Sequence, residues 1–368
     1  MKRKLALLLA CVLLLCGCGR QTPAAPTAAP TTPPTAAPTT PSGSAPTTAP
    51  TTPPTTAPTE PAYRHPLTGA GLEQPWSGQM VAVMVNNIKP AMPQSGLSQA
   101  DMIFEMEEEG GATRNMALYS DVSKLNAIGS VRSARTYFVS VAAAYDAYLV
   151  HCGGSIHIQG GRYDAAGNKL ANWKDIDEQG YLYSKYFYRD KDRYSSGYAW
   201  EHTLFTTGDL LAKALENKNQ SNLKPGVTFR DTVTLPDGKD ATEITVKFKG
   251  GKTTSFTYEE ATGLYVRSQY GSQTIDAATK EAVKVKNVIT LYTKQWYCGC
   301  GNGHQYYDTI GSGDGYVAID GKIVPIKWSR ATVNDPYTYT LENGEPLDLA
   351  VGSSYISIVG TKHPIQYK

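Results

Sequence analysis

The sequence predicts an α/β N-terminal domain with a mixed sheet, followed by a β-rich C-terminal domain and preceded by a disordered stalk. Between residues 63 and 222, apolar runs bounded by turn residues are mixed with helical patterns, which is typical of α/β folds. From residue 223 to 368, apolar and polar residues alternate as they do in half-buried strands. We therefore expect four segments: a signal peptide (1–17), a lipidated linker (18–62), an α/β domain (63–222) and a β-rich domain (223–368).

Local patterns predict the individual elements of the two domains. In the first domain, buried strands are expected at residues 79–86, 101–106, 114–119 and 147–150, and a helix at 207–217. The polar, proline-containing residues 86–100 predict a loop. In the second domain, strands are expected at residues 227–230, 243–248, 254–258, 263–267, 285–292, 315–319 and 355–359.

The first residues resemble the leader of a bacterial lipoprotein. Three basic residues precede an apolar run at 5–15, and this run is shorter than the ~20 residues that a membrane-crossing helix needs. Leu15, Cys16, Gly17 and Cys18 match the pattern at which such leaders are cleaved before a modified cysteine. The sequence therefore predicts a lipid on Cys18 and a place on the extracytoplasmic face of the cell membrane. The alternative is an ordinary secreted protein that is cleaved elsewhere.

Residues 21–62 have a composition that cannot form a folded core. They contain 14 Thr, 13 Pro and 10 Ala, and Glu60 is their only charged residue. Such a segment lacks the apolar surface that would offset its ordering entropy, and its prolines favour the polyproline II conformation. The sequence predicts a stalk that holds the folded part away from the membrane. The threonines are candidates for O-linked glycosylation.

Charge and cysteine content limit the classes of function. The whole chain has a formal charge of +2, which includes the basic residues of the leader, so the folded part is near neutral and no nucleic-acid partner is expected. Beyond the leader, the cysteines are Cys152, Cys298 and Cys300, an odd number for an oxidising compartment, so at least one free thiol is expected. No cofactor is expected. The glycine turns match neither a phosphate-binding P-loop nor a nucleophile elbow.

The stretch from Gly129 to Ser155 contains the most distinctive pattern. Apolar residues at helical spacing predict a helix that starts at Gly129 and Ser130, with Arg132 and Arg135 in its first turns. Cations are unfavourable at a helix N-terminus, so we expect an anion nearby, either an internal carboxylate or a ligand. After the strand at 147–150, residues 151–155 (HCGGS) predict a glycine turn at the sheet edge where ligands bind in open α/β sheets.

A series of motifs resembles the YerB-like bacterial lipoprotein family, a domain of unknown function with an N-terminal and a C-terminal part. The motifs are HPLTG (65–69), VAVMVNN (81–87), PQSGLSQAD (93–101), EEGGATR (108–114), GSVRSAR (129–135), YDA (145–147) and HCGGS (151–155). The resemblance extends from Tyr63 to the C-terminus. It implies an exported, lipid-anchored protein in two parts, and it implies no particular reaction.

Polar residues of the first domain form the principal candidate site. Its candidate ligand-binding residues are Asn86, Asn87, Arg114, Arg132, Arg135, His151, Ser155 and His202, and its candidate catalytic residues are Glu105, Glu109, His151 and His202. This set predicts binding of an anionic envelope glycan or phosphorylated polymer. One alternative is an envelope hydrolase or transferase that uses a carboxylate and a histidine beside the arginines. Another is a scaffold that recruits a protein through an exposed apolar patch. The arginines are equally explained by internal ion pairs with Glu105 or Glu109.

Three further patterns each have a functional and a structural interpretation. Residues 181–200 hold eight aromatic residues interleaved with basic ones, which suits either sugar binding or a packing layer. Cys152 beside His151 is either a reactive thiol or a packing residue. Cys298, Cys300 and His304 are a weak metal-binding pattern, and the alternative is a loop with a local disulfide or free thiols.

Overall fold

The computed structural model describes residues 60–159, 173–180, 182–224, 226–300, 303–361 and 363–368. The predicted signal peptide, Cys18 and nearly all of the predicted linker lie outside these residues. In the described part of the chain, no helix has both the length and the apolar character that a membrane span requires.

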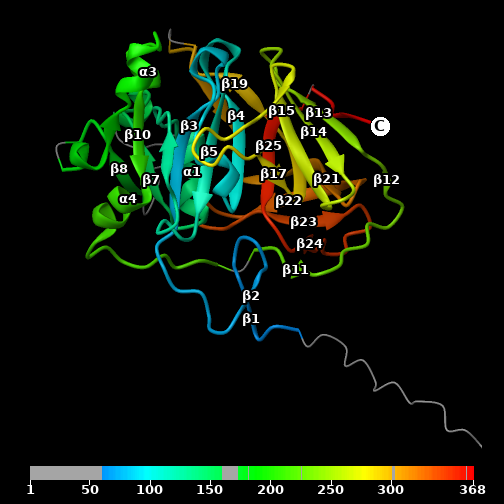
Figure 1. Ribbon diagram of the computed structural model, residues 1–368. Coiled ribbons are helices and arrows are strands. Elements are labelled where there is room, and N and C mark those ends of the chain that lie inside the picture. The colour runs from blue at the N-terminus through cyan, green and yellow to red at the C-terminus, as the bar shows by residue number, and fades with distance from the viewer. Residues whose placement is uncertain (1–59, 160–172, 181, 225, 301–302, 362) are drawn as a thin grey trace, which may run out of the picture. The chain divides into compact units, whose positions relative to one another are not determined.

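An eleven-stranded mixed sheet organises the fold, and its strands come from both halves of the chain (Figure 1). Its order is β12-β22-β21-β18-β25-β4-β5-β3-β7-β8, with β23 beside β22. The first half contributes β3 (Val81–Asn86), β4 (Met102–Glu107), β5 (Thr113–Tyr119), β7 (Tyr148–His151) and β8 (Lys174–Asp177). The second half contributes β12 (Lys239–Asp240), β18 (Asn287–Thr293), β21 (Gly311–Ile319), β22 (Lys322–Arg330), β23 (Thr338–Leu341) and β25 (Ser354–Gly360).

The two halves meet where β25 runs parallel to β4, with Ser354 opposite Met102. β18 is parallel to β25, while β3 and β4 are both antiparallel to β5 and therefore share one direction. β7 is parallel to β3, and β8 is parallel to β7. The carboxyl ends of β3, β4, β7, β8, β18 and β25 consequently lie along one edge of the sheet, called the carboxyl edge below.

Each face of the central sheet buries its own hydrophobic core, because successive strand residues point to opposite faces. Met84 and Phe104 pack on one face with α1 (Thr136–Ala144). On the opposite face, Val83 packs with two further sheets and with α4 (Gly208–Leu215). The first of these sheets has three strands: β6 (Ala127–Gly129), β9 (Tyr188–Arg189) and β10 (Leu204–Thr207). The second has six strands: β13 (Glu243–Lys247), β14 (Thr253–Glu259), β15 (Leu264–Gln269), β16 (Ser272–Gln273), β17 (Lys284–Val285) and β26 (Gln366–Tyr367).

Short elements complete the fold around these layers. The small pairs are β1 (Tyr63–Arg64) with β2 (Gly71–Leu72), β11 (Phe229–Arg230) with β24 (Leu349–Ala350), and β19 (Gln295–Tyr297) with β20 (Gln305–Tyr307). The short helices are η1 (Lys89–Ala91), η2 (Leu97–Gln99), η3 (Glu109–Gly111), α2 (Ile156–Gln159), η4 (Ser184–Tyr186), α3 (Lys191–Ser195) and η5 (Trp200–His202).

Most predicted strands are confirmed within a few residues. The mixed sheet and the β-rich character of the second half are also present, although the structure is so strand-rich that the α/β label fits only loosely. The predicted strand at residues 285–292 is divided between β17 and β18, which join different sheets. The domain boundary near residue 222 stays a prediction, and strands from both sides of it share the central sheet.

The predicted start of the helix at Gly129 is wrong. Gly129 ends β6, which pairs with β10, and α1 begins seven residues later at Thr136 with Arg135 as its N-cap. Gly129 has φ +152°, and a Cβ there would lie 2.7 Å from the Phe205 ring, so the close pairing requires glycine. Arg132 therefore lies in the connection between β6 and α1 rather than in a first helical turn.

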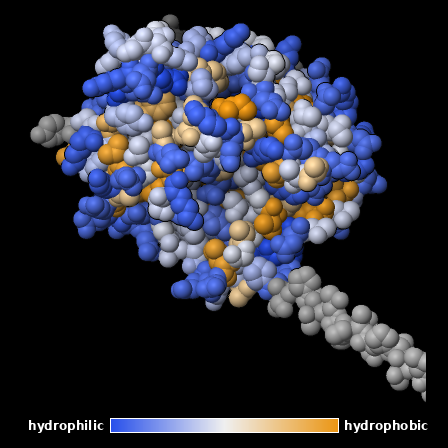
Figure 2. Space-filling model, viewed as in Figure 1, coloured by the Kyte–Doolittle hydropathy of each residue, from blue (hydrophilic) through white to orange (hydrophobic). Residues whose placement is uncertain are grey.

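The surface in the view of Figure 2 is mostly hydrophilic, and the apolar residues among those described form small, separated groups. Surfaces of this kind are ordinary for folded proteins. This face therefore offers little support for the scaffold alternative, which requires a large contiguous apolar patch.

Candidate functional site

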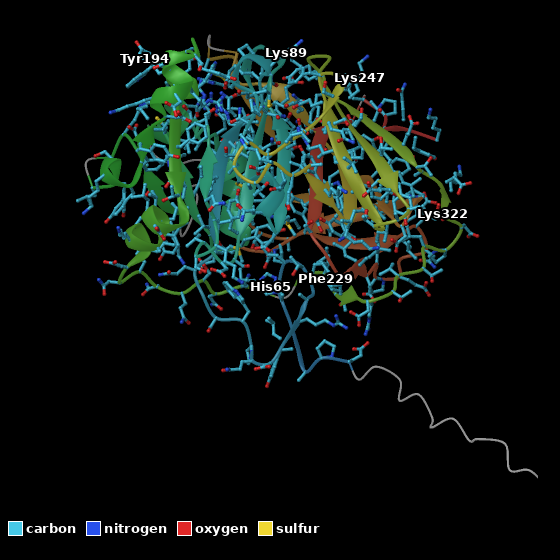
Figure 3. The ribbon with its side chains drawn as sticks, in the orientation of Figure 1. His65, Lys89, Tyr194, Phe229, Lys247 and Lys322 are labelled. Carbon is cyan, nitrogen blue, oxygen red and sulfur yellow. A yellow bond between two sulfur atoms is a disulfide. The ribbon has the colours of Figure 1, made fainter. Side chains whose placement is uncertain are left out.

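The carboxyl edge gathers most of the predicted site residues. Asn86 ends β3 and Asn87 follows it, Glu105 and Glu109 belong to the end of β4 and the turn after it, and His151 ends β7. In Figure 3, Lys89 and Tyr194 lie toward one end of the molecule, whereas His65 and Phe229 lie toward the opposite end. The expectation that these residues gather at one sheet edge follows from the shared direction of the strands.

Two of the three arginines are neutralised by carboxylates of the turn after β4. Arg114, which is buried, forms an ion pair with Glu108 and donates to the Ser133 carbonyl at 2.5 Å. Arg135 binds Glu109 through two hydrogen bonds of 2.8 and 2.6 Å, the bidentate geometry that a guanidinium favours. Burial lowers the pKa of Arg114 to about 10, against the opposing charge of Glu108.

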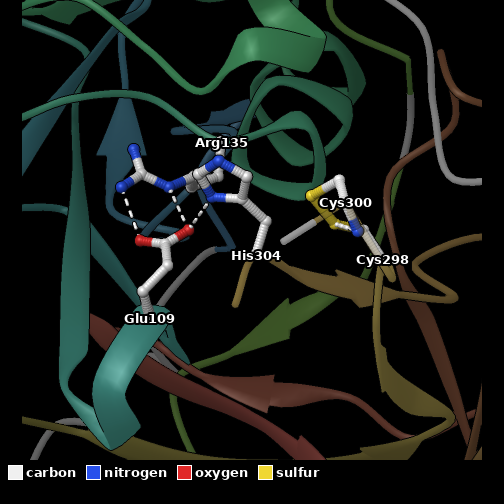
Figure 4. The surroundings of a disulfide bond; sticks show 5 residues. All are labelled: Glu109, Arg135, Cys298, Cys300 and His304. Carbon is white, nitrogen blue, oxygen red and sulfur yellow. Dashed lines mark hydrogen bonds and ion pairs between the residues drawn. A yellow bond between two sulfur atoms is a disulfide. The ribbon is translucent and has the colours of Figure 1, made fainter. Parts of the chain in front are cut away.

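Glu109 has a second cationic or polar partner in His304. The His304 Nδ1 donates to Glu109 Oε1 at 2.5 Å, and Figure 4 shows Glu109 between His304 and Arg135. Burial raises the pKa of Glu109, but the hydrogen bonds and charge of Arg135, together with His304, outweigh it and lower the pKa to about 2. Glu109 is therefore ionised across the physiological pH range and is fixed in position by its partners.

Glu105 lies in a separate buried network. Its Oε1 accepts hydrogen bonds from Asn87 Nδ2 at 2.8 Å and from the Thr254 hydroxyl at 3.0 Å, and its Oε2 accepts from the Tyr355 hydroxyl at 2.8 Å. Arg267 of β15 donates to the Tyr355 oxygen at 3.0 Å. This network joins β3, β4, β14, β15 and β25, so its role in the structure is to lock the second sheet onto the central one.

Arg132 differs from the other two arginines. Its backbone N–H donates to the Met84 carbonyl at 2.9 Å, and its carbonyl accepts from Cys152 N–H at 3.1 Å, so it lies between the ends of β3 and β7. Its side chain is half-buried and makes no ion pair or hydrogen bond with any described residue, and its Nε is fully buried. A partly desolvated guanidinium without a counter-ion favours an external anion.

His202 lies beside Arg132 at the end of β3. Asn86 Nδ2 donates to His202 Nδ1 at 3.2 Å, which leaves the Nε2 as the protonated nitrogen of the neutral ring. Burial lowers the pKa of His202, and the charges of Arg132 and Arg193 lower it further, against the effect of Glu201. At neutral pH His202 therefore offers one N–H donor rather than a second full charge.

An open groove of about 540 Å³ runs past His202. Its lining residues are Lys89, Pro90, Met92, Ser196, Gly197, Tyr198, Ala199 and His202. A second hollow shares Lys89 and Met92 with it and extends toward Tyr270 and Ile275 of the second half. The two hollows, which meet at Lys89 and Met92, are together called the Lys89 groove below.

His151 and Ser155 are predicted ligand-binding residues, but their described contacts are structural. His151 is buried, donates from Nδ1 to the Gly153 carbonyl at 2.8 Å, and lies 3.6 Å from Asp177 Oδ1 of β8. Ser155 is buried in the turn before α2, where its N–H donates to the Ala134 carbonyl at 3.3 Å. The described contacts of both residues hold the turn after β7 in place.

Cys152 is the free cysteine, as the odd number of cysteines predicts. Its thiol donates to Glu178 at 3.2 Å, and burial together with this hydrogen bond raises its pKa to about 12. A nucleophilic cysteine requires a lowered pKa, so the packing interpretation is favoured for Cys152.

Cys298 and Cys300 form a disulfide in the turn between β19 and β20. The structure brings His157 of α2 to this pair: a ring nitrogen of His157 and the two sulfur atoms all lie within 4.8 Å of one another. His304, the third member of the sequence pattern, instead binds Glu109 and contacts the His157 ring with centroids 5.7 Å apart.

The aromatic stretch contains both packed and exposed residues. The rings of Tyr183 and Tyr186 pack against the core, and Phe187 is buried. Tyr194 and Trp200 are 58% and 56% exposed, and their rings meet edge to face at 5.6 Å near the Lys89 groove lining at Ala199. Of this stretch, Tyr181 lies outside the described residues. Tyr183, Tyr186 and Phe187 therefore fit the interpretation as a packing layer, whereas the exposed rings of Tyr194 and Trp200 fit the sugar-binding interpretation.

Several residues of the site have no sequence signal that singles them out. Glu108 is one of three consecutive glutamates, and nothing local indicates that it rather than Glu109 pairs with Arg114. Lys89 and His157 occur in no motif, and both reach the site through tertiary packing. The sequence signal for Lys89 is its position in the polar loop that directly follows the end of a predicted strand.

The fold and the polar carboxyl edge define a strand-rich class of protein with a mixed central sheet shared by two sequence segments. Residues 67–221 match the N-terminal domain, and residues 244–356 the C-terminal domain, of the family described as "Protein of unknown function (DUF3048)". The chain belongs to this DUF3048 family, which confirms the predicted YerB-like resemblance.

The relatives include a protein and a solved structure from the same organism. The chain is 27% identical over 301 residues to "Putative lipoprotein YerB" of Bacillus subtilis (strain 168), covering 80% of this chain and 85% of that protein. It is also similar to the crystal structure of the YerB protein from Bacillus subtilis, with a TM-score of 0.67 and 25% identity over 82% of this chain and 99% of that one.

Proposed function

We propose that this protein is a membrane-anchored lipoprotein that binds an anionic cell-envelope polymer along the Lys89 groove and at Arg132, which lies near the groove residue His202. Anchoring is supported by the pattern around Cys18 and by the name of the Bacillus relative. The proline-rich linker gives the folded part a reach on the order of 100 Å from the membrane if it is extended at ~3.1 Å per residue.

The guanidinium of Arg132, which has no ion pair or hydrogen bond within the described part of the chain, is the observation that carries the binding proposal. Arg114 and Arg135 have carboxylate partners at hydrogen-bond distance, so their charges are already compensated. Arg132 has no such partner among the described residues, although its Nε is buried. A buried donor without an acceptor costs about 1–3 kcal/mol, and a bound phosphate or carboxylate would remove that cost.

The surroundings of Arg132 suit an anionic glycan or a phosphorylated polymer. His202 offers an N–H donor, and Lys89 adds a cation to the groove that His202 lines. Trp200 and Tyr194 present exposed rings, and such rings stack on the apolar faces of sugars. Charge and aromatic surface therefore lie together, as a polymer with both sugar rings and anionic groups requires.

The geometry favours binding over acid–base catalysis. The oxygens of Glu105 are all occupied within a buried network, and Glu109 is held ionised by Arg135. In the described part of the chain, no hydrogen bond joins either glutamate to His151 or His202, and the histidine that does contact Glu109, His304, acts as a further donor to it. A carboxylate that keeps its charge and is clamped at both oxygens is a poor proton donor.

Binding is tested by co-sedimentation of the purified folded part with cell-wall sacculi that retain their anionic polymers. Arg132→Ala is expected to lower the bound fraction at least tenfold, and added salt is expected to lower binding of the unchanged chain. Lys327→Ala removes a cation paired with Asp314 on an exposed surface and is the matched control. Equal sedimentation of the Arg132 variant and the control would contradict the proposal, as would undiminished binding to sacculi stripped of anionic polymers.

Anchoring is tested separately by fractionation of cells that express the full chain. The unchanged protein is expected in the membrane fraction, and the Cys18→Ala variant in the medium or the soluble fraction. Metabolic labelling with a lipid analogue should mark the unchanged protein alone. Membrane retention of the unlabelled Cys18→Ala variant would contradict lipidation at this residue.

A further inference from the structure

We propose that His157, Cys298 and Cys300 form a binding site for a thiophilic metal ion, with Zn²⁺ as the reference ion, which opens when the Cys298–Cys300 disulfide is reduced. The site is separate from Arg132 and the Lys89 groove, so the proposal does not depend on anion binding. Because the two sulfur atoms are joined in a disulfide, the site binds metal only after a dithiol has reduced that bond.

The three donor atoms come together from distant parts of the chain. His157 belongs to α2, which follows β7, whereas both cysteines belong to the turn between β19 and β20. One ring nitrogen of His157 and the two sulfur atoms lie within 4.8 Å of one another. Ligand atoms around a tetrahedral Zn²⁺ lie ~3.3–3.8 Å apart, given Zn–S and Zn–N distances of ~2.3 and ~2.0 Å. Small side-chain movements therefore suffice to bring the three atoms onto one ion.

The His157 ring is a second and independent observation. Its Nε2 is buried and has no hydrogen-bond partner in the described residues, which is costly for a polar atom unless something binds it. An imidazole nitrogen without a hydrogen-bond partner is available to coordinate a metal ion.

The surroundings of the cysteines suit thiolates as well as a disulfide. The backbone N–H of Cys300 donates to Cys298 Sγ at 3.0 Å, and such a bond stabilises negative charge on the sulfur. His304 lies beside His157, with ring centroids 5.7 Å apart. Its Nδ1 donates to Glu109 (Figure 4), which fixes the orientation of the ring next to the cysteines. Three protein ligands leave a fourth tetrahedral position open to water or another donor.

The chemistry requires a reductant and balances as a two-electron exchange. A dithiol attacks one sulfur as its thiolate, the Cys298–Cys300 bond breaks, and a mixed disulfide forms. The second thiol of the reductant then displaces the remaining cysteine sulfur, so the dithiol is oxidised to a disulfide and the protein gains two thiols. On binding Zn²⁺, the two thiols release two protons and form two Zn–S bonds, and His157 adds a nitrogen ligand.

Metal titration of the folded chain in a Cys18→Ser, Cys152→Ser background without the leader tests this inference, because Cys298 and Cys300 are then its cysteines. The probes are Co²⁺, whose thiolate complexes absorb in the near ultraviolet, and Zn²⁺, which displaces it. After reduction with a phosphine and removal of the reductant, the chain is expected to bind one ion with a thiolate-to-cobalt absorption band. The oxidised chain is expected to show no band.

Variants distinguish a built site from adventitious binding. Cys298→Ser and Cys300→Ser are each expected to abolish the band, and His157→Ala to weaken Zn²⁺ binding at least tenfold. His363→Ala, which alters a histidine away from this cluster, should bind like the unchanged chain. The inference is overturned if the reduced, folded chain binds no ion, if the oxidised chain binds equally, or if His157→Ala binds as tightly as His363→Ala. Loss of sacculus binding in the Arg132 variant would leave these results unaffected.

Discussion

Replacing Glu109 with glutamine tests the interpretation of the carboxyl edge as a network in which carboxylates compensate Arg114 and Arg135, while Arg132 has no carboxylate partner among the described residues. Glutamine keeps the size of the side chain and removes its charge. Arg135 then loses its bidentate carboxylate, and His304 loses its charged acceptor. We expect the Glu109→Gln variant to fold with a lower free energy of unfolding at neutral pH.

The magnitude follows from the pKa of Glu109, which falls from 4.5 to about 2 on folding. At about 1.4 kcal/mol per pH unit this difference corresponds to at most ~3.4 kcal/mol. The Glu109 side chain is 22% exposed, so solvent screening reduces the expected loss to about 1–2 kcal/mol. Because the folded pKa is the lower one, this stabilisation is present above pH 4.5 and is lost as the pH falls through about 2.

Urea denaturation of the folded part at neutral pH and at about pH 3 measures both effects. The difference between the unchanged chain and Glu109→Gln should fall to less than half of its neutral value at about pH 3, where linkage leaves ~40% of the contribution. Asp314→Asn is the control, since its ion pair with Lys327 is exposed and should have no measurable effect. The reasoning is refuted if Glu109→Gln is as stable as the unchanged chain, or if the difference is the same at both pH values.

Three further predictions, two substitutions and one chemical modification, concern other parts of the structure. Tyr355→Phe removes a hydroxyl donor from buried Glu105 and should cost about 1–3 kcal/mol in urea denaturation, whereas a loss within error would show that the network is not structural. Gly250→Ala should cost a similar amount, because its Cβ would lie 2.2 Å from the Cα of Gly111; an unchanged thermal midpoint would contradict this close contact. Cys152 should resist alkylation at pH 8 in the folded chain and react after unfolding, as followed by mass spectrometry, since its pKa is about 12; rapid alkylation of the folded chain would contradict the burial argument.

Local patterns predicted most of the secondary structure correctly because they depend on nearest neighbours along the chain. The run at Val81–Asn86 is apolar at every position but the last, as expected for a strand buried on both faces. Thr207 accepts a hydrogen bond from Leu210 N–H and begins α4 where the sequence pattern indicates. The helix start near Gly129 was missed because the pairing of β6 with β10 joins residues more than 70 positions apart, and this pairing overrides local helical periodicity.

By itself, the sequence determined the strand and helix segments, the gathering of polar residues at strand ends and the membership of the YerB-like family. Only the tertiary structure decided which carboxylate meets which arginine: Glu108 pairs with Arg114 and Glu109 with Arg135, whereas Arg132 has no carboxylate partner among the described residues. It also decided that β25 pairs with β4 and that His157 meets the Cys298–Cys300 pair. The physical reason is range: periodicity and capping act over a few residues, whereas ion pairs and metal ligands are chosen by the packing of distant segments.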